Sequence, residues 1–498
     1  MNTTNKFIFF AITVCTLFLI WTPDYPPMVD IPQHAAQISI FLDIIKNQSN
    51  WSDLFEINLI TPYWIGYGPW ILLSLIFSVT VAFKIIISFF FIAYLAASSA
   101  LIDKFNAPKK LKVLVIPIFF GFSYEWGLFT FLAAVPLGIF FFIQSINTSK
   151  NLTIKNIIYS TLLGLILFSS HILVFIFFCL ISYIQSILIL KTSKKINIKK
   201  ILTFTTPYFI YLAITIKYIL ITDPLSNLYS YGEHFFIYSS GGNRILEYIT
   251  YPWSGNTQVN EYNKIIIYLL AISSPFIIGL KPSKDLNKYI PLIVCTILWF
   301  TLPHFISNTF LIYQRYSIFT FIFYLLIFEK NHKQGISSSK DAFLVITTLL
   351  LLYNPAANLF FFSKDTNDFK KTLDLTSTGK RALSLVFSPE SLTVNNPVVY
   401  IHFPLWYQAE KSGLVDFNFA WFNPQIVRYK PENVPEVRPS FEWTPGEYQR
   451  IKKCEIYDYI FVRSLVPIEE KKITIASCTY TLKNPQFGSW YLYEKSHL

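Results

Sequence analysis

Side chains that could do chemistry are few in this chain, and the aspartate at position 30 is the first of them. Asp30 stands in the sequence PPMVDIPQHAAQIS, where the prolines restrict the backbone and the following residues have the apolar spacing of a helix. The start of a helix favours a negative charge. A carboxylate held there could act as a general base or bind a metal ion, although an aspartate that only caps the helix would give the same pattern.

Three more candidates lie where apolar stretches turn or begin. Glu125 stands in YEWG at the expected tip of a helical hairpin, and His171 occupies the next such tip. A carboxylate at membrane depth is costly, so Glu125 faces water, a partner or a substrate, or is an ordinary solvated acid. His171 is a ligand-binding or a packed histidine. Arg315, in IYQRYSIF, could clamp a phosphate or extend to lipid headgroups.

The remaining candidates are polar residues next to these positions or in one long loop. Residues 222–262 contain the sequences YGEHFF and GGNRILEY and have the length and mixed chemistry of a loop that covers a substrate. This loop adds Glu233, His234 and Arg244 as candidates for substrate binding, and His34, four residues after Asp30, is a further one.

The elements that must position these side chains are very apolar. Hydrophobic residues make up 53% of the 498 residues and charged residues only 14%, whereas soluble chains carry about 25% charged residues. Apolar stretches recur from Phe7 to about Phe362, and a helix that crosses a membrane needs about 20 such residues. The composition therefore predicts an α-helical polytopic membrane protein. It excludes a disordered, fibrous or ordinary soluble chain, and a lone signal peptide.

The net charge of +12 indicates membrane topology and not a nucleic-acid partner, because the lysines are concentrated between apolar stretches. By the positive-inside rule the lysine-rich loops are cytoplasmic, and Lys6 places the N-terminus there too. In residues 22–63 and 222–262 the charged side chains are mostly acidic, and both segments are expected outside. The five lysine-rich loops are 103–112, 148–156, 191–200, 281–288 and 330–340.

Loop charge and stretch length together predict about 11 membrane spans. Residues 64–80 are rich in aromatic side chains and are expected to lie along the interface, because a crossing there would move all five lysine-rich loops outside. Two long stretches are expected to be hairpins that cross twice, with tips near 123–127 and 169–171. The expected spans are 7–21, 81–102, 111–147 (twice), 157–190 (twice), 201–221, 263–280, 289–304, 314–329 and 341–360.

The chain is expected to divide at residue 362. Residues 1–362 would form the transmembrane domain, with outer loops at 22–80 and 222–262, and residues 363–498 would form a soluble α/β domain outside the cytoplasm.

Two features of the C-terminal region support this division. Its Cys454 and Cys478 could form a disulfide in an oxidising compartment. Its composition is mixed and polar, with one helix-like stretch at 369–387 and strand-like runs at 398–403, 457–462 and 489–494.

The pattern as a whole resembles the GT-C-type membrane glycosyltransferases. The likeness rests on DIPQH after the first span, a second acid on the next outer hairpin, a long later outer loop, and QRY at the start of a late span. The closest likeness is to a bacterial subgroup with a C-terminal stretch like WYQAEKSGLVDFNFAWFNPQIVRY. The resemblance implies transfer of a sugar, with inversion, from a polyprenyl-phosphate carrier to a glycan, lipid or protein acceptor at the outer face of the bacterial inner membrane.

The resemblance also implies roles for individual residues. Asp30 would be the catalytic acidic residue, Arg315 would hold the carrier phosphate, and Glu125 would help to bind the acceptor or, with Asp30, a divalent cation such as Mg²⁺ or Mn²⁺. The second acid departs from the family pattern, because it is a glutamate in YEWG and not an aspartate followed by proline. All three side chains are expected to border one pocket at the outer rim of the bilayer.

Three other functions are compatible with parts of the pattern. A transporter or flippase of lipid-linked glycans would need functional charges inside spans or broken helices in paired halves. The central spans lack charged residues and the sequence has no two-fold repeat, which counts against this function. A glycan polymerase or ligase would share the outward site and the lipid-linked donor, with several outer-loop arginines. A structural or sensor protein would use the C-terminal domain to bind glycan.

Overall fold

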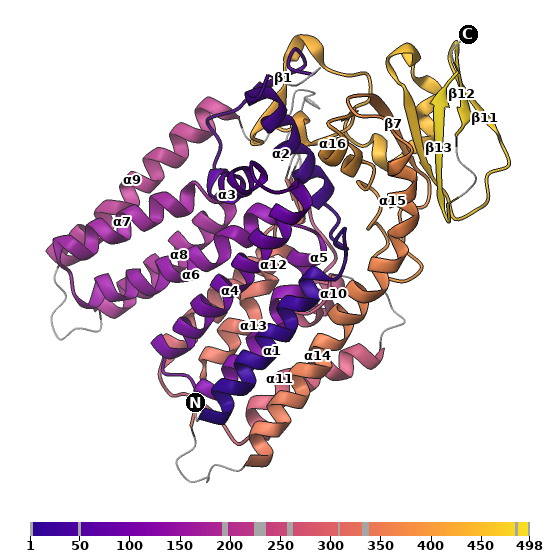
Figure 1. The fold of residues 1–498 in the computed structure, drawn as a ribbon. Helices are drawn as coiled ribbons and strands as arrows, with labels where there is room; N and C mark the ends of the chain where they lie inside the picture. The colour runs from indigo at the N-terminus through magenta and orange to yellow at the C-terminus, as the bar shows by residue number, and fades with distance from the viewer. Residues whose placement is uncertain are drawn as a thin grey trace.

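The computed structural model describes residues 3–47, 51–191, 198–223, 236–255, 262–306, 309–330, 338–483 and 487–496. The chain is mostly helical, with a sheet near the C-terminus (Figure 1). Within these residues, five helices are long and apolar enough to cross a membrane: α4 (Val79–Lys104), α6 (Phe129–Lys150), α8 (Ile172–Lys191), α9 (Ile198–Thr222) and α14 (Ser338–Asp365). Other apolar helices are α1 (Thr3–Trp21), α7 (Ile154–Phe168), α11 (Tyr262–Ile277) and α12 (Ile290–Thr301).

Among the expected spans that do not form long α-helices, two differ most from the expectation. The stretch before the first hairpin tip consists of two 3-10 helices, η1 (Lys109–Val115) and η2 (Pro117–Phe120). Their apolar side chains are buried, and non-α backbone at membrane depth is tolerated where protein covers it. The late stretch forms α13 (Ser317–Leu326), whose ten residues span only about 15 Å. The described helices therefore do not clearly add up to 11 spans.

The aromatic segment expected along the interface is a separate short helix. It forms α3 (Trp64–Ser74), which at eleven residues is about 16 Å long and too short to cross a bilayer. A turn follows, and the Ser78 side chain accepts a hydrogen bond from the Val81 N–H to cap α4. The sequence placed this break near residue 80, and the structure has it at residues 75–78.

The C-terminal region contains one mixed sheet with the strand order β11-β12-β13-β10-β7-β8. The strands β10, β7 and β8 pair in parallel, and the other neighbours are antiparallel. The bounds are β7 (Arg381–Val386), β8 (Leu414–Val415), β10 (Tyr459–Arg463), β11 (Lys472–Ile475), β12 (Cys478–Leu482) and β13 (Trp490–Lys495). Cys454 and Cys478 form a disulfide.

The strand expectations for 457–462 and 489–494 are confirmed by β10 and β13, whereas the third expected strand and the expected helix were wrong. Residues 398–403 form buried turns, because the prolines that flank them cannot donate to a strand ladder. The helix expected over 369–387 is only α15 (Asn367–Asp374), because the chain turns through Gly379 at φ +66° and continues as β7.

The C-terminal region packs on the segment that follows α1. Helix α16 (Leu405–Lys411) packs against α2 (Ile31–Ile45), and β1 (Phe55–Ile57) pairs antiparallel with β9 (Val427–Tyr429). In Figure 1, α2 and α16 lie side by side at the end of the bundle opposite the N-terminus. Helix α14 continues to Asp365, so it crosses the expected boundary at residue 362.

Candidate active site

Asp30 lies at the first turn of α2 and is fixed there by backbone contacts. Its N–H donates to the carbonyl of Trp126 (3.1 Å), and the N–H of Val29 donates to the carbonyl of Glu125 (3.1 Å). Although Asp30 occupies the capping position, its side chain makes no capping hydrogen bond to α2. The explanation that this aspartate serves only as a helix cap therefore lacks the contact it requires.

The carboxyl group of Asp30 lies among cationic and imidazole groups. Its Oδ1 is 3.5 Å from Nε2 of His402, and its side chain is 19% exposed. Burial raises the pKa of Asp30 to about 7, against the opposing effect of the positive charge of Arg315. A carboxyl group that is partly open to solvent and titrates near neutrality is suited to accept a proton from a hydroxyl.

Arg315 is held by its own chain at the 3-10 turn η4 (Gln314–Tyr316). Its Nε donates to the carbonyl of Leu311 (3.2 Å) and its Nη2 to that of Phe310 (3.1 Å). Its Nη1 lies 3.4 Å from Nε2 of His171. The structure therefore brings Arg315 and His171 together, with the charge of Arg315 acting on Asp30.

His34 is engaged by a chain of hydrogen bonds between three parts of the molecule. Its Nδ1 is 2.5 Å from the hydroxyl of Tyr67, and that hydroxyl donates to Oε1 of Gln425 (2.8 Å). Since the tyrosine proton goes to Gln425, Nδ1 of His34 must be the donor to the tyrosine oxygen. Burial lowers the pKa of His34 to about 3, so the ring is neutral and links α2, α3 and the C-terminal region.

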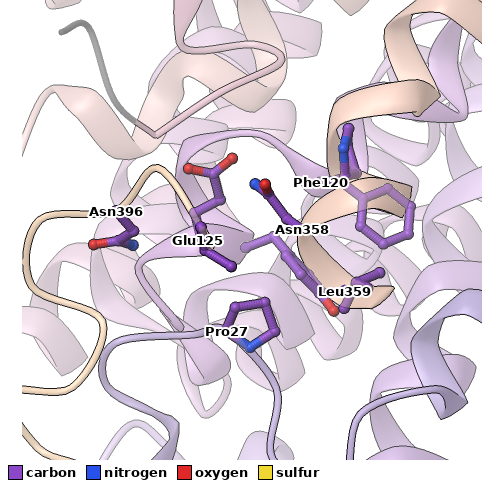
Figure 2. A pocket seen from close by; sticks show the side chains of 9 residues that line it. Pro27, Phe120, Glu125, Asn358, Leu359 and Asn396 are labelled. Atoms are coloured by element: carbon purple, nitrogen blue, oxygen red, sulfur yellow. The ribbon is translucent and has the colours of Figure 1, made fainter. Parts of the chain in front are cut away.

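Glu125 ends the short helix α5 (Phe122–Glu125) and faces a different partner. Its Oε2 accepts a hydrogen bond from the N–H of Gly255 (2.8 Å). It also borders a small hollow that is partly open to solvent, where the side chains of Asn358 and Asn396 lie nearby (Figure 2). Among the described residues, Asp30 and Arg315 are not in the lining of this hollow. The segments that carry Asp30 and Glu125 are joined by backbone hydrogen bonds, but the three side chains expected in one pocket do not share this hollow.

Arg244 is a packed residue of α10 (Gly241–Thr250). Its Nη1 donates to the carbonyl of Trp299 (2.9 Å), and its guanidinium carbon lies 4.2 Å from the ring centroid of Tyr313, a cation–π distance. Arg244 is buried and connects α10 to α12. Two other predicted binding residues, Glu233 and His234, lie outside the described residues.

Sequence reasoning missed two residues of the C-terminal region that belong to this neighbourhood. His402 contacts Asp30 directly. Glu442 lies near enough for the charge of Asp30 to act on it, and burial together with that charge raises the pKa of Glu442 to about 8. His402 stands four residues before the WYQA stretch quoted above, but no spacing in the sequence connects either residue with Asp30.

The expected divalent cation does not fit the residues present. Glu125 already accepts a backbone hydrogen bond, and Asp30 faces an imidazole and a guanidinium charge. In the described part of the chain, the only group of three possible ligands within reach of one another is Cys454, Glu455 and Cys478. The sulfur atoms of that group are bonded to each other. We therefore assign no step to a metal ion.

Comparison with known proteins gives no independent assignment: no protein-family model and no curated protein matches the chain. The chemical argument therefore depends on the site itself. Where the C-terminal region covers α2, a carboxyl group with a pKa of about 7 lies 3.5 Å from a buried imidazole. The positive charge of a guanidinium group, which two carbonyls hold in place, acts on that carboxyl.

Proposed function

We propose that this protein is a multi-pass glycosyltransferase of the bacterial inner membrane. It moves a sugar from a polyprenyl-phosphate donor to a hydroxyl group of a glycan, lipid or protein acceptor on the outer face. The observation that supports this proposal best is the Asp30 carboxyl, which has a pKa of about 7 and lies within the field of Arg315. A proton acceptor beside a group suited to phosphate is the pair that this transfer needs.

The proposed reaction is a single displacement. The Asp30 carboxylate takes the proton of the acceptor hydroxyl while the hydroxyl oxygen forms a bond to the anomeric carbon of the donor. The bond between that carbon and the phosphate oxygen breaks, and its electron pair leaves with the polyprenyl phosphate. Arg315 stabilises the charge that develops on this phosphate. One displacement inverts the configuration of the anomeric carbon.

The proposed topology has about 11 spans, a cytoplasmic N-terminus and an extracytoplasmic C-terminal region. It is supported by the positions of the N-terminus and α2 at opposite ends of the bundle (Figure 1). The disulfide between Cys454 and Cys478 also supports it, because disulfides persist in oxidising compartments.

The test uses purified full-length protein in lipid vesicles with a panel of undecaprenyl-phosphate sugars and glycan, lipid and protein fractions of the cell envelope as acceptors. Release of undecaprenyl phosphate is measured. We expect acceptor-dependent release that falls about 10²- to 10⁴-fold in Asp30→Asn, the range for loss of a general base. Asp43→Asn is the matched control, because Asp43 lies on the same helix but accepts a hydrogen bond from Ser412. Absence of release with every donor, or equal rates in Asp30→Asn, would overturn the proposal.

A further inference from the structure

His402 joins the C-terminal region to the start of α2 through both of its ring nitrogens. Its Nε2 lies 3.5 Å from Oδ1 of Asp30, and its Nδ1 lies 3.1 Å from Nε2 of Gln33. The ring is buried and stands just before α16, which packs on α2. A residue that comes late in the chain thus touches the proposed catalytic carboxyl.

The orientation of the Gln33 amide is fixed by the backbone. The N–H of Phe419 donates to Oε1 of Gln33 over 2.9 Å, and a backbone N–H can only donate. The oxygen of the amide therefore faces Phe419, and its NH₂ group faces His402. This contact removes the usual ambiguity between the oxygen and the nitrogen of a glutamine side chain.

The tautomer of His402 follows from this orientation. An amide NH₂ group can only donate hydrogen bonds, so Nδ1 of His402 must accept the hydrogen bond from Gln33. A neutral imidazole carries one proton, which is then on Nε2, the nitrogen that faces Asp30. A doubly protonated ring would place an N–H against the NH₂ group of Gln33, and burial also opposes the charged form, since it lowers the pKa of His402 to about 3.

We infer that His402 is a positioning residue: a neutral ring, protonated at Nε2 and aligned by Gln33, directs its N–H at Oδ1 of Asp30 and leaves Oδ2 for the acceptor hydroxyl. At 3.5 Å the contact is electrostatic, and a shortening of about half an ångström would make it a hydrogen bond, as contacts in empty sites often do when substrate binds. The tautomer stands on geometry alone, whereas its role in catalysis rests on the proposed function. The C-terminal region would then complete the site.

The tautomer of His402 can be determined without an assay of transfer activity. Full-length protein labelled with ¹⁵N-histidine is placed in lipid bilayers, and its histidine signals are recorded by solid-state NMR at neutral pH. The signal of His402 is identified as the one of seven histidines that is missing in His402→Gln. We expect a neutral ring protonated at Nε2. The variant Gln33→Glu offers only acceptor oxygens, so it should move the proton to Nδ1 or give the doubly protonated ring.

The positioning role is tested by two substitutions that differ in the place of their amide nitrogen. The nitrogen of His402→Gln can occupy the place of Nε2 and donate to Asp30, whereas the shorter side chain of His402→Asn reaches only the place of Nδ1. We expect His402→Gln to keep kcat within about tenfold and His402→Asn to lose about 10- to 100-fold, with donor KM little changed, as for residues that orient a catalytic group.

Each outcome decides the inference. A native ring protonated at Nδ1, or an unchanged tautomer in Gln33→Glu, overturns the assignment even if the protein transfers no sugar. Equal and near-native kcat in His402→Gln and His402→Asn overturns the positioning role in a protein that is active. If His402→Gln does not fold, the native signal is identified instead as the one that is missing in His402→Asn. Loss of all transfer activity with the expected tautomer counts against the proposed function and not against this inference.

Discussion

The backbone N–H of Asp30 donates a 3.1 Å hydrogen bond to the carbonyl of Trp126, so the segment after α1 is attached to the tip of the hairpin before α6. The next residue, Gly127, has a positive φ of +72°. A Cβ atom there would lie 2.9 Å from the nitrogen of Asp30 and 3.0 Å from that of Ile31. The position of Asp30 therefore depends on a glycine in another segment.

We expect Gly127→Ala to lower both stability and transfer activity. The added methyl group must push the start of α2 away, and a left-handed backbone costs a non-glycine residue about 1–3 kcal/mol. A fall in the thermal unfolding midpoint and a fall in kcat measure the two effects. Gly68→Ala is the control, because Gly68 lies in α3 and a Cβ there meets nothing within 4 Å. A Gly127→Ala protein as active as Gly68→Ala would contradict this role of the hairpin tip.

We expect Asp30→Asn to be more stable than the native protein at pH 8, although its transfer activity is much lower. Folding raises the pKa of Asp30 from 3.8 to about 7, so the folded state holds the proton more tightly than the unfolded state. The resulting loss of stability is absent below about pH 4, grows between pH 4 and 7, and is complete above pH 7. Asparagine does not ionise, so the variant should gain on the order of 4 kcal/mol at pH 8 and almost nothing at pH 4. Unfolding midpoints of the two proteins at both pH values provide the measurement, and a variant less stable at pH 8 would be the opposite result.

Transfer activity should rise with pH through about 7. A general base works only when deprotonated, so kcat/KM should increase about tenfold per pH unit below pH 7 and level off above it. The charge of Arg315 lowers the pKa of Asp30, so Arg315→Gln should move the rise to higher pH in addition to slowing the reaction. Glu442→Gln should leave the rise near pH 7 in place. A profile that is flat between pH 5 and 8 would exclude Asp30 as the base.

The sequence predicts the apolar helices and the region around Asp30 because both are local patterns. Long runs of apolar residues form helices such as α4 and α6. The proline that follows Asp30 lies in the first turn of α2, so the helix begins directly after this aspartate. The 3-10 segment at 109–120 was missed, because an apolar run has the same composition whether it spans lipid or is covered by protein. Burial by other segments, which a composition does not contain, decides between the two.

The composition of the site was less predictable than its location. Asp30 and Arg315 stand out as charges beside apolar stretches, and the structure brings them within electrostatic range. His402 and Gln33 meet only because α16 packs on α2 and β9 pairs with β1. Such contacts depend on tertiary packing between segments far apart in the chain. Arg244 shows the converse, since its charge suggested a ligand although the side chain is packed against Trp299 and Tyr313.

Removing the disulfide should lower the stability of the fold far more than the rate of sugar transfer. Cys454 and Cys478 are 24 residues apart, and closing a loop of that size stabilises a fold by about 3 kcal/mol. The bond joins Cys454 to β12, and neither cysteine is among the described contacts of Asp30 or His402. At 20 °C the double variant Cys454→Ser, Cys478→Ser should therefore keep its transfer activity within about threefold of the native protein. On heating, it should lose that activity at a lower temperature than the native protein does.

The same cysteines report on topology. A reducing agent should lower the unfolding midpoint of the native protein and leave the double-serine variant unchanged, which separates the bond from other effects of reduction. In intact cells, an alkylating reagent should modify Cys454 and Cys478 only after reduction, because the bond forms in an oxidising compartment outside the cytoplasm. Free thiols at both positions in unreduced cells would place the C-terminal region in the cytoplasm. The proposed site, which that region covers, would then face a compartment opposite to the one from which we expect the acceptor to come.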